Sequence, residues 1–95
     1  MISKKRHRDG TTKVVFTLPD GGEPVSVVAD FNDWDPFAHP MKRRANGVRS
    51  VSVMLAPGTC ARFRYLAASG CFFDDPDGDG VEPNGYGDTH TLLAV

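Results

Sequence analysis

Apolar and polar residues alternate in several short runs of this 95-residue chain, and a period of two predicts β-strands. The clearest run spans residues 59–67, where Ala61, Phe63 and Tyr65 share one face and two arginines lie between them. Further strands are expected over residues 13–18, 25–29, 48–55, 71–74 and 90–95. The inward positions of these runs predict a core of Val14, Phe16, Val27, Val51, Val53, Phe63 and Tyr65.

Helical periodicity is nearly absent, because windows of helical length are interrupted by some of the 10 Gly and 7 Pro residues. The pattern therefore predicts an all-β fold, an antiparallel β-sandwich of about seven strands. We expect one domain over residues 12–95, preceded by a basic leader over residues 1–11. Two stretches do not read as strands, residues 30–41 and 75–88, and long loops on a rigid sandwich often carry function.

The net charge and the composition limit the classes of partner that the chain is expected to bind. The formal net charge is −1, which gives no overall attraction to nucleic acid or to a membrane surface. Because no apolar run approaches the ~18 residues of a membrane span and no apolar core follows the basic N-terminus, we expect a cytoplasmic protein. The run Lys4-Lys5-Arg6-His7-Arg8 has no aromatic neighbour for base stacking and is expected to be a frayed, solvated tail.

Catalytic chemistry has no convincing candidate. The three His residues are scattered, and neither a nucleophile elbow nor a phosphate-binding loop occurs. Carboxylates in the two loops would allow an acid pair by residue type, but so small a sandwich has little concave surface to bury one. Cys60 and Cys71 do not form a disulfide scaffold or a zinc site and are interpreted as small apolar thiols. We therefore expect no enzyme and no cofactor.

One acidic loop resembles half of a metal site. Asp75-Pro76-Asp77-Gly78-Asp79-Gly80 has the D-x-D-x-D-G spacing that opens a calcium loop. The twelfth position is Tyr86, where a bidentate Glu is needed. We expect an acidic turn without an ion.

The only Trp lies in a polar loop, within Asp30-Phe31-Asn32-Asp33-Trp34-Asp35-Pro36. On residue type alone, this ring either folds back to cap the sandwich or is presented to a ligand. A sugar is the natural ligand for an exposed ring, because its axial C–H groups pack on the π face while its hydroxyls seek polar neighbours.

The segment Val25–Pro36, V-x-V-V-A-D-F-N-D-W-D-P, resembles the signature of a glycogen- and starch-binding module family. That family includes the early-set domain of isoamylases and branching enzymes and the glycogen-binding domain of the AMP-activated protein kinase β subunit. Similar motifs follow in order at Pro57–Gly70, Asp75-Pro76 and Asn84–Asp88. The first five residues also resemble the start of small, free-standing bacterial members. The resemblance implies an immunoglobulin-like, early-set sandwich.

The resemblance also implies a binding site for α-glucan, without catalysis. Trp34 matches the first stacking Trp of the family, and the second matches Phe72, or Phe73 if the hairpin is one residue longer. Arg64 takes the basic position, and Asn84, Tyr86 and His90 would complete the rim. The alternative is a protein-interaction module of the same fold that docks on a partner such as a glycogen-metabolising enzyme and does not bind sugar.

Overall fold

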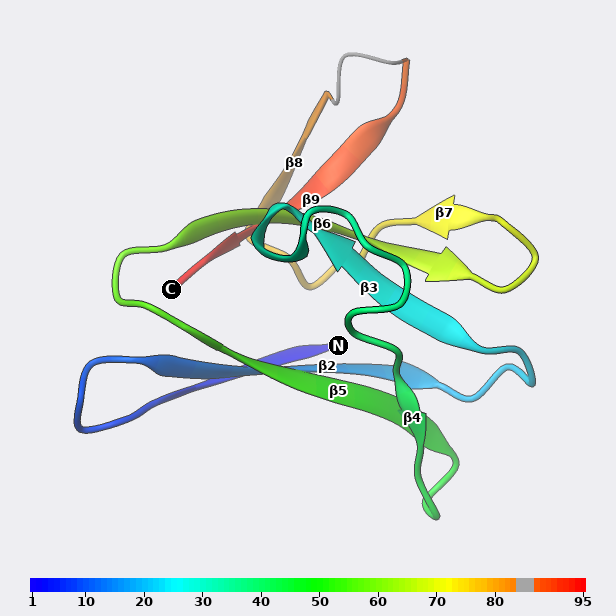
Figure 1. Cartoon of the computed structure of the whole chain (residues 1–95), viewed down its shortest axis with the longest axis horizontal. Coiled ribbons are helices and arrows are strands. Elements are labelled where there is room, and N and C mark those ends of the chain that lie inside the picture. Colours follow the sequence, from blue (N-terminus) through cyan, green and yellow to red (C-terminus); the bar gives the residue numbers. More distant parts are fainter. Residues whose placement is uncertain (84–86) are drawn as a thin grey trace.

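Two antiparallel sheets pack face to face in the computed structural model, which describes residues 1–83 and 87–95 (Figure 1). The first sheet has the order β1 (Ile2–Arg6), β2 (Thr12–Pro19), β5 (Val48–Leu55) and β4 (Lys42–Arg43). The second has the order β3 (Val25–Ala29), β6 (Cys60–Ala67), β9 (Thr89–Ala94) and β8 (Gly80–Pro83), with β7 (Phe72–Phe73) also paired to β6. The predicted all-β sandwich is confirmed.

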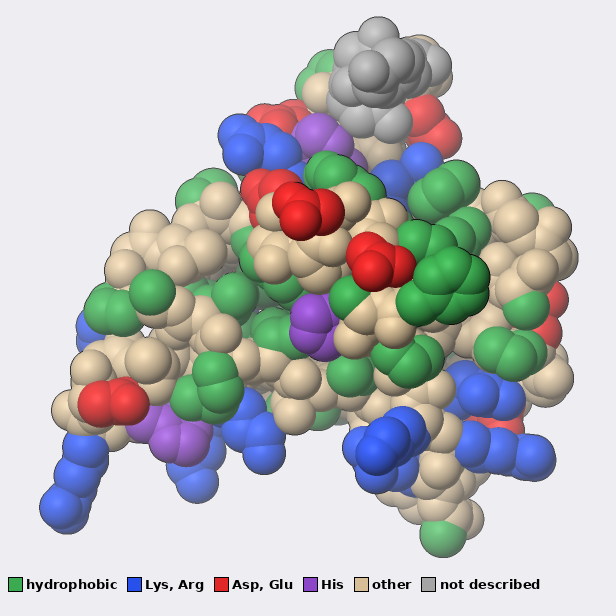
Figure 2. Space-filling model, viewed as in Figure 1, with side chains coloured by type: hydrophobic (Ala, Val, Ile, Leu, Met, Phe, Trp, Pro, Cys, Tyr) green, Lys and Arg blue, Asp and Glu red, His purple; other side chains and the backbone are tan. Residues whose placement is uncertain are grey.

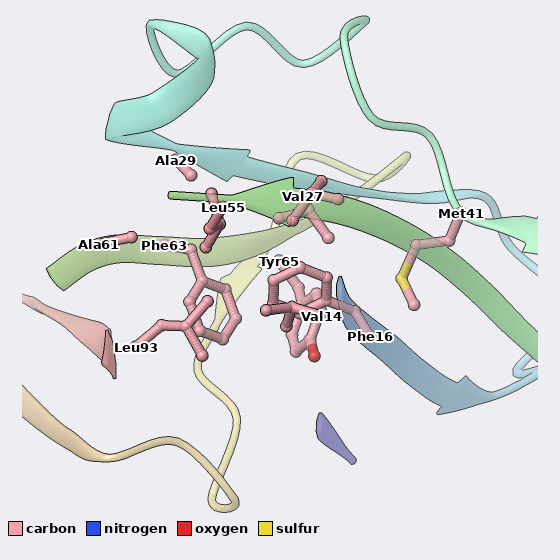
Figure 3. Packing of buried hydrophobic residues seen from close by; sticks show 11 residues of the cluster. Val14, Phe16, Val27, Ala29, Met41, Leu55, Ala61, Phe63, Tyr65 and Leu93 are labelled. Atoms are coloured by element: carbon pink, nitrogen blue, oxygen red, sulfur yellow. The ribbon is translucent and has the colours of Figure 1, made fainter. Parts of the chain in front are cut away.

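The core lies between the sheets and is built around three aromatic rings (Figure 3). Phe16 of β2 meets Phe63 of β6 edge to face at a centroid distance of 4.9 Å, and Tyr65 lies 5.5 Å from Phe63. All three rings are fully buried. The predicted alternation along β6 is therefore in the right register. Of the predicted core residues, Val51 alone is only half-buried and packs at the margin.

The N-terminal segment is a strand, so the expectation of a frayed tail was wrong. Ile2–Arg6 pair with β2 in an antiparallel register that joins Ile2 to Phe16 and Arg6 to Thr12. The physical reason is that β2 would otherwise present an unpaired edge of N–H and C=O groups. Lys4 adds an anchor, because its Nζ lies 2.7 Å from Asp79 Oδ2. That residues 12–95 fold as a domain without this strand stays a prediction.

The stretch 75–88, expected as one long loop, contains the short strand β8. Gly80 pairs with Leu92 and Pro83 with Thr89, so β8 extends the second sheet beyond β9. A short strand that ends on Pro at a sheet edge carries little hydrophobic alternation, which is why the sequence pattern did not indicate it.

Basic residues are concentrated on the strands of the first sheet, although the net charge of the chain is close to zero. The four strands of the first sheet, all fully described, contain no Asp or Glu. They carry Lys4, Lys5, Arg6, Lys13, Lys42, Arg43 and Arg49. Figure 2 shows the basic side chains mostly toward the first sheet and most acidic ones toward the second. We call the first sheet the basic sheet.

Within residues 1–83 and 87–95, no helix is both long enough and apolar enough to span a bilayer. The single helical element in the described part of the chain is a 3₁₀ turn, η1 (Asp30–Asn32), at the start of the Trp-bearing loop.

Candidate functional site

A groove of about 600 Å³ lies on the outer face of the second sheet. Its floor comes from outward positions of neighbouring strands, with Val28 on β3 and Arg64 and Leu66 on β6. The same alternation that turns Phe63 and Tyr65 into the core turns the residues between them onto this face. The walls are Trp34, Pro36, Phe72 and His90.

The turn that leads to Trp34 is held by Asn32. Its Oδ1 accepts a hydrogen bond from the Ala29 N–H at 3.0 Å, and its Nδ2 donates to the Val27 carbonyl at 3.1 Å. The same Nδ2 lies 2.8 Å from Nδ1 of His39, which belongs to the returning half of the loop. One amide side chain thus fastens both halves of the loop to β3, and the loop backbone is positioned before any ligand arrives.

Trp34 sits in an unusual backbone conformation. Both Asp33 and Trp34 have left-handed φ angles, of 57° and 58°, a region that residues with side chains rarely adopt. The Trp34 N–H donates to the Ala29 carbonyl at 2.8 Å, which closes the turn. The residue remains 41% exposed, and its ring centroid lies 6.0 Å from that of His90. Backbone strain of this kind persists only where the surrounding structure enforces it, and strained residues cluster at functional sites.

Arg64 lies in the groove floor between aromatic and acidic neighbours. Its guanidinium carbon is 5.1 Å above the Phe72 ring centroid, a cation–π contact. Its Nη1 donates to Asp88 Oδ2 at 3.1 Å, and its Nε lies 3.6 Å from Asp74 Oδ1. The latter is an ion-pair distance too long for a hydrogen bond, so Nε is buried without a hydrogen-bond acceptor among the described residues. The side chain is only 11% exposed.

A chain of polar contacts supports the wall at His90. The His90 Nε2 lies 2.6 Å from Glu82 Oε1, and the same oxygen accepts a hydrogen bond from Arg62 Nε. The hydrogen bonds from His90 and Arg62 hold the pKa of Glu82 below its usual value. A charged Glu82 holds the His90 imidazole beside Trp34 through Nε2. The other ring nitrogen, Nδ1, takes no part in the contact with Glu82.

Four of the residues named from sequence line the same groove: Trp34, Arg64, Phe72 and His90. Asn84 and Tyr86 lie outside the described residues. Of the two candidates for the second aromatic position, Phe72 lines the groove, whereas Phe73 packs against the core residue Tyr65 with ring centroids 5.2 Å apart.

Three lining residues were not anticipated, namely Val28, Pro36 and Leu66. Val28 and Leu66 could have been predicted from the sequence, because the alternation of each strand places them on its outward face. Pro36 follows the Trp segment, and its place at the groove depends on the path of the loop.

The carboxylates of Asp75 and Asp79 in the acidic loop bind other groups of the protein. Asp75 is buried and accepts hydrogen bonds from the Tyr65 hydroxyl at 2.5 Å and from the Asp77 N–H at 2.8 Å. Asp79 pairs with Lys4. In residues 1–83 and 87–95, no group of three or more His, Cys, Asp or Glu residues is arranged to hold a metal ion.

Sequence comparison relates the chain to glucan branching enzymes. It is 43% identical over 65 residues to the 1,4-alpha-glucan branching enzyme GlgB of Deinococcus radiodurans, covering 63% of this chain and 9% of that enzyme. It is 30% identical over 89 residues to GlgB of a Synechococcus species (strain CC9605), covering 92% of this chain and 12% of the enzyme. The chain thus spans about a tenth of the length of these relatives. No family model matches the chain.

A solved structure supports the fold. Ferric enterobactin esterase from Salmonella typhimurium superimposes with a TM-score of 0.77, covering 99% of this chain and 34% of the esterase, at 15% sequence identity. At that identity the likeness concerns the fold alone. The sequence matches, by contrast, relate this chain to a short N-terminal region of the branching enzymes.

Proposed function

We propose that this protein is a non-catalytic module that binds α-glucan in the groove beside Trp34. The observation that carries the proposal is the convergence of Trp34, Arg64, Phe72 and His90 on one groove, although they come from four separate segments of the chain. The sequence relation to enzymes named for α-glucan branching supports the same ligand class.

The chemistry of the groove suits a sugar chain. Trp34 and the half-exposed Phe72 offer flat apolar faces on which the C–H groups of a pyranose pack. Arg64 and His90 supply polar atoms between those faces for hydroxyl groups. Because the groove is open to solvent, it removes water from only part of each sugar. We therefore expect weak binding, governed by few contacts.

Affinity electrophoresis in gels containing glycogen tests the proposal. The wild-type chain should be retarded relative to a glycogen-free gel, and Trp34→Ala should abolish the retardation because the exposed ring is a main stacking surface. Phe72→Ala should weaken it, and Phe72→Trp should strengthen it by enlarging the stacking area. Met54→Ala is the matched control, since Met54 is 51% exposed on the basic sheet, away from the groove.

Thermal melting of each variant separates binding from folding. Trp34 and Phe72 are exposed enough that their replacement should change the melting temperature little. Arg64→Ala is a less clean test, because that side chain is largely covered and pairs with two carboxylates. We expect it to weaken binding by about 1–3 kcal/mol and also to lower stability. Absence of retardation of the wild type on glycogen, amylopectin and β-cyclodextrin would overturn the proposal.

Docking on a partner protein is a second candidate function, favoured by the basic sheet. Lys5 and Lys13 stand opposite each other in the β1–β2 register, and both are exposed. Like charges in that position repel each other, and an acidic partner surface would relieve the repulsion. Sedimentation with a glucan branching enzyme, at low and at high salt, tests this function. A salt-sensitive complex that Lys5→Ser/Lys13→Ser weakens would support it, and no complex at low salt would reject it.

A further inference from the structure

Phe37 is the most exposed large apolar residue among those the structure describes, with 87% of its surface accessible to water. It follows Pro36, a wall of the groove beside Trp34, by one residue. The ring does not stand alone, because Pro36 and Pro40 line one groove together with Phe37, and contiguous apolar surface of this kind marks binding sites.

The loop holds Phe37 in place. Its N–H donates to Asp35 Oδ1 at 2.8 Å, and the Ala38 N–H donates to the Asp35 carbonyl at 3.3 Å. The returning segment is then tied to β3, because the Val27 N–H donates to the His39 carbonyl at 3.0 Å. Phe37 is therefore carried on a turn fixed at both ends. A ring presented in this way loses little backbone freedom on binding.

A second groove of about 490 Å³ begins at this ring. Its walls include Phe37, Pro40 and Ala68, and it shares two lining residues, Pro36 and Leu66, with the groove beside Trp34. The two grooves therefore adjoin each other at those two side chains. We call the second one the Phe37 groove.

We propose that the Phe37 groove is a second sugar subsite, which takes the units of an α-glucan chain that extend past Pro36. This inference rests on the proposed function of the first groove. The Phe37 groove is mostly apolar, and Ser26 supplies the polar side chain among its lining residues. A pyranose that stacks on Phe37 would bury its C–H face there and keep most hydroxyls in water, so this subsite adds affinity without demanding many hydrogen bonds.

Continuity of the two grooves argues for a sugar chain as the occupant. A glucan is a linear repeat of identical units, so a chain long enough to leave the first groove at Pro36 offers the same C–H faces to Phe37. Occupation of both subsites by one molecule makes the second contact intramolecular, which raises the affinity for long chains more than for short ones.

Isothermal titration with maltotriose and maltoheptaose tests the second subsite. The wild type should bind the longer oligosaccharide more tightly, and Phe37→Ala should lower its affinity for maltoheptaose about three- to tenfold while leaving maltotriose unchanged. Phe37→Trp should retain or increase the preference for the longer chain. Met54→Ala, an exposed apolar residue on the opposite sheet, serves as the control and should change neither affinity.

The outcomes separate the two proposals. Equal affinities of wild type and Phe37→Ala for maltoheptaose, with maltotriose binding intact, would overturn the second subsite and leave the first groove as the site. A wild type that binds neither oligosaccharide would overturn both. A change in sedimentation of the sugar-free protein on Phe37→Ala, with unchanged maltoheptaose affinity, would assign the ring to contact between copies of the chain and also overturn the subsite.

Discussion

Replacing Tyr65 by Phe removes one hydroxyl from the core, and we expect a large effect on stability. The hydroxyl is buried and donates to Asp75 Oδ2 at 2.5 Å. Burial is the main cause that raises the pKa of Tyr65, so it is the neutral phenol that donates. Burial by itself would raise the pKa of Asp75, but hydrogen bonds from Tyr65, the Asp77 N–H and the Met1 amine outweigh it and hold that pKa below its usual value.

The magnitude follows from the type of bond. A hydrogen bond to a charged acceptor contributes about 1.5–3 kcal/mol to stability. In a domain of this size each kcal/mol corresponds to about 4–8 °C in melting temperature, so Tyr65→Phe should lower the melting temperature by roughly 6–24 °C. Asp75→Ala should cost more, because it leaves the Tyr65 hydroxyl buried without its acceptor. In the double variant the two losses should overlap by about 1–3 kcal/mol.

The pH dependence provides a second check. Since the folded-state pKa of Asp75 is lowered, its stabilising contribution is fully present above the unfolded-state pKa of about 3.9 and is lost as pH falls through the lower folded value. The gap between wild type and Tyr65→Phe should therefore be largest near neutral pH and should shrink at strongly acidic pH. Urea melts followed by circular dichroism measure it. Additive losses in the double variant, or a gap that does not change with pH, would refute the reasoning.

Three further predictions concern the core, a glycine and the acidic loop. Phe63→Ala should cost about 3–5 kcal/mol in a denaturant melt, because the ring is fully buried against Phe16, and a loss below about 1 kcal/mol would contradict this packing. Gly78→Ala should lower the melting temperature markedly, since an added Cβ would lie 2.1 Å from Thr91 Cγ2, while Gly21→Ala, with nothing within 4 Å, is its control. Millimolar calcium should leave the melting temperature unchanged because Asp75 and its neighbours already bind protein groups, and a rise of several degrees reversed by chelator would reject that view.

Alternation of residue type predicted the strands that lie between water and the core. In β6, each inward residue is apolar and two of the outward ones are arginine. The pattern therefore predicts both the strand and which of its faces packs on the core. The same parity placed Arg64 on the groove face and Phe63 in the core. The sequence around Trp34 indicates a candidate site because the ring lies among carboxylates, where no strand or helix pattern accounts for a large apolar side chain.

The edge strands β1 and β8 escaped prediction for a physical reason. The sequence I-S-K-K-R of β1 has no apolar face, because its contribution is backbone pairing with β2 and an ion pair from Lys4. Backbone hydrogen bonding does not depend on side-chain hydropathy, so a hydropathy pattern does not reveal it. The hydrogen bond between Tyr65 and Asp75 is equally hard to predict, since it joins a core strand to a loop whose carboxylate spacing indicates half of a calcium site.

The division of β6 between core and groove has a consequence for directed evolution of this chain. Odd-numbered positions from 61 to 67 face the hydrophobic interior, and even-numbered ones from 62 to 66 face outward, where Arg64 and Leu66 line the groove beside Trp34. A library that randomises only the even positions varies the floor of the groove while the inward core residues stay constant. An insertion or deletion of one residue inside β6 exchanges the two roles at once, so length variants should be rare among the survivors of any selection.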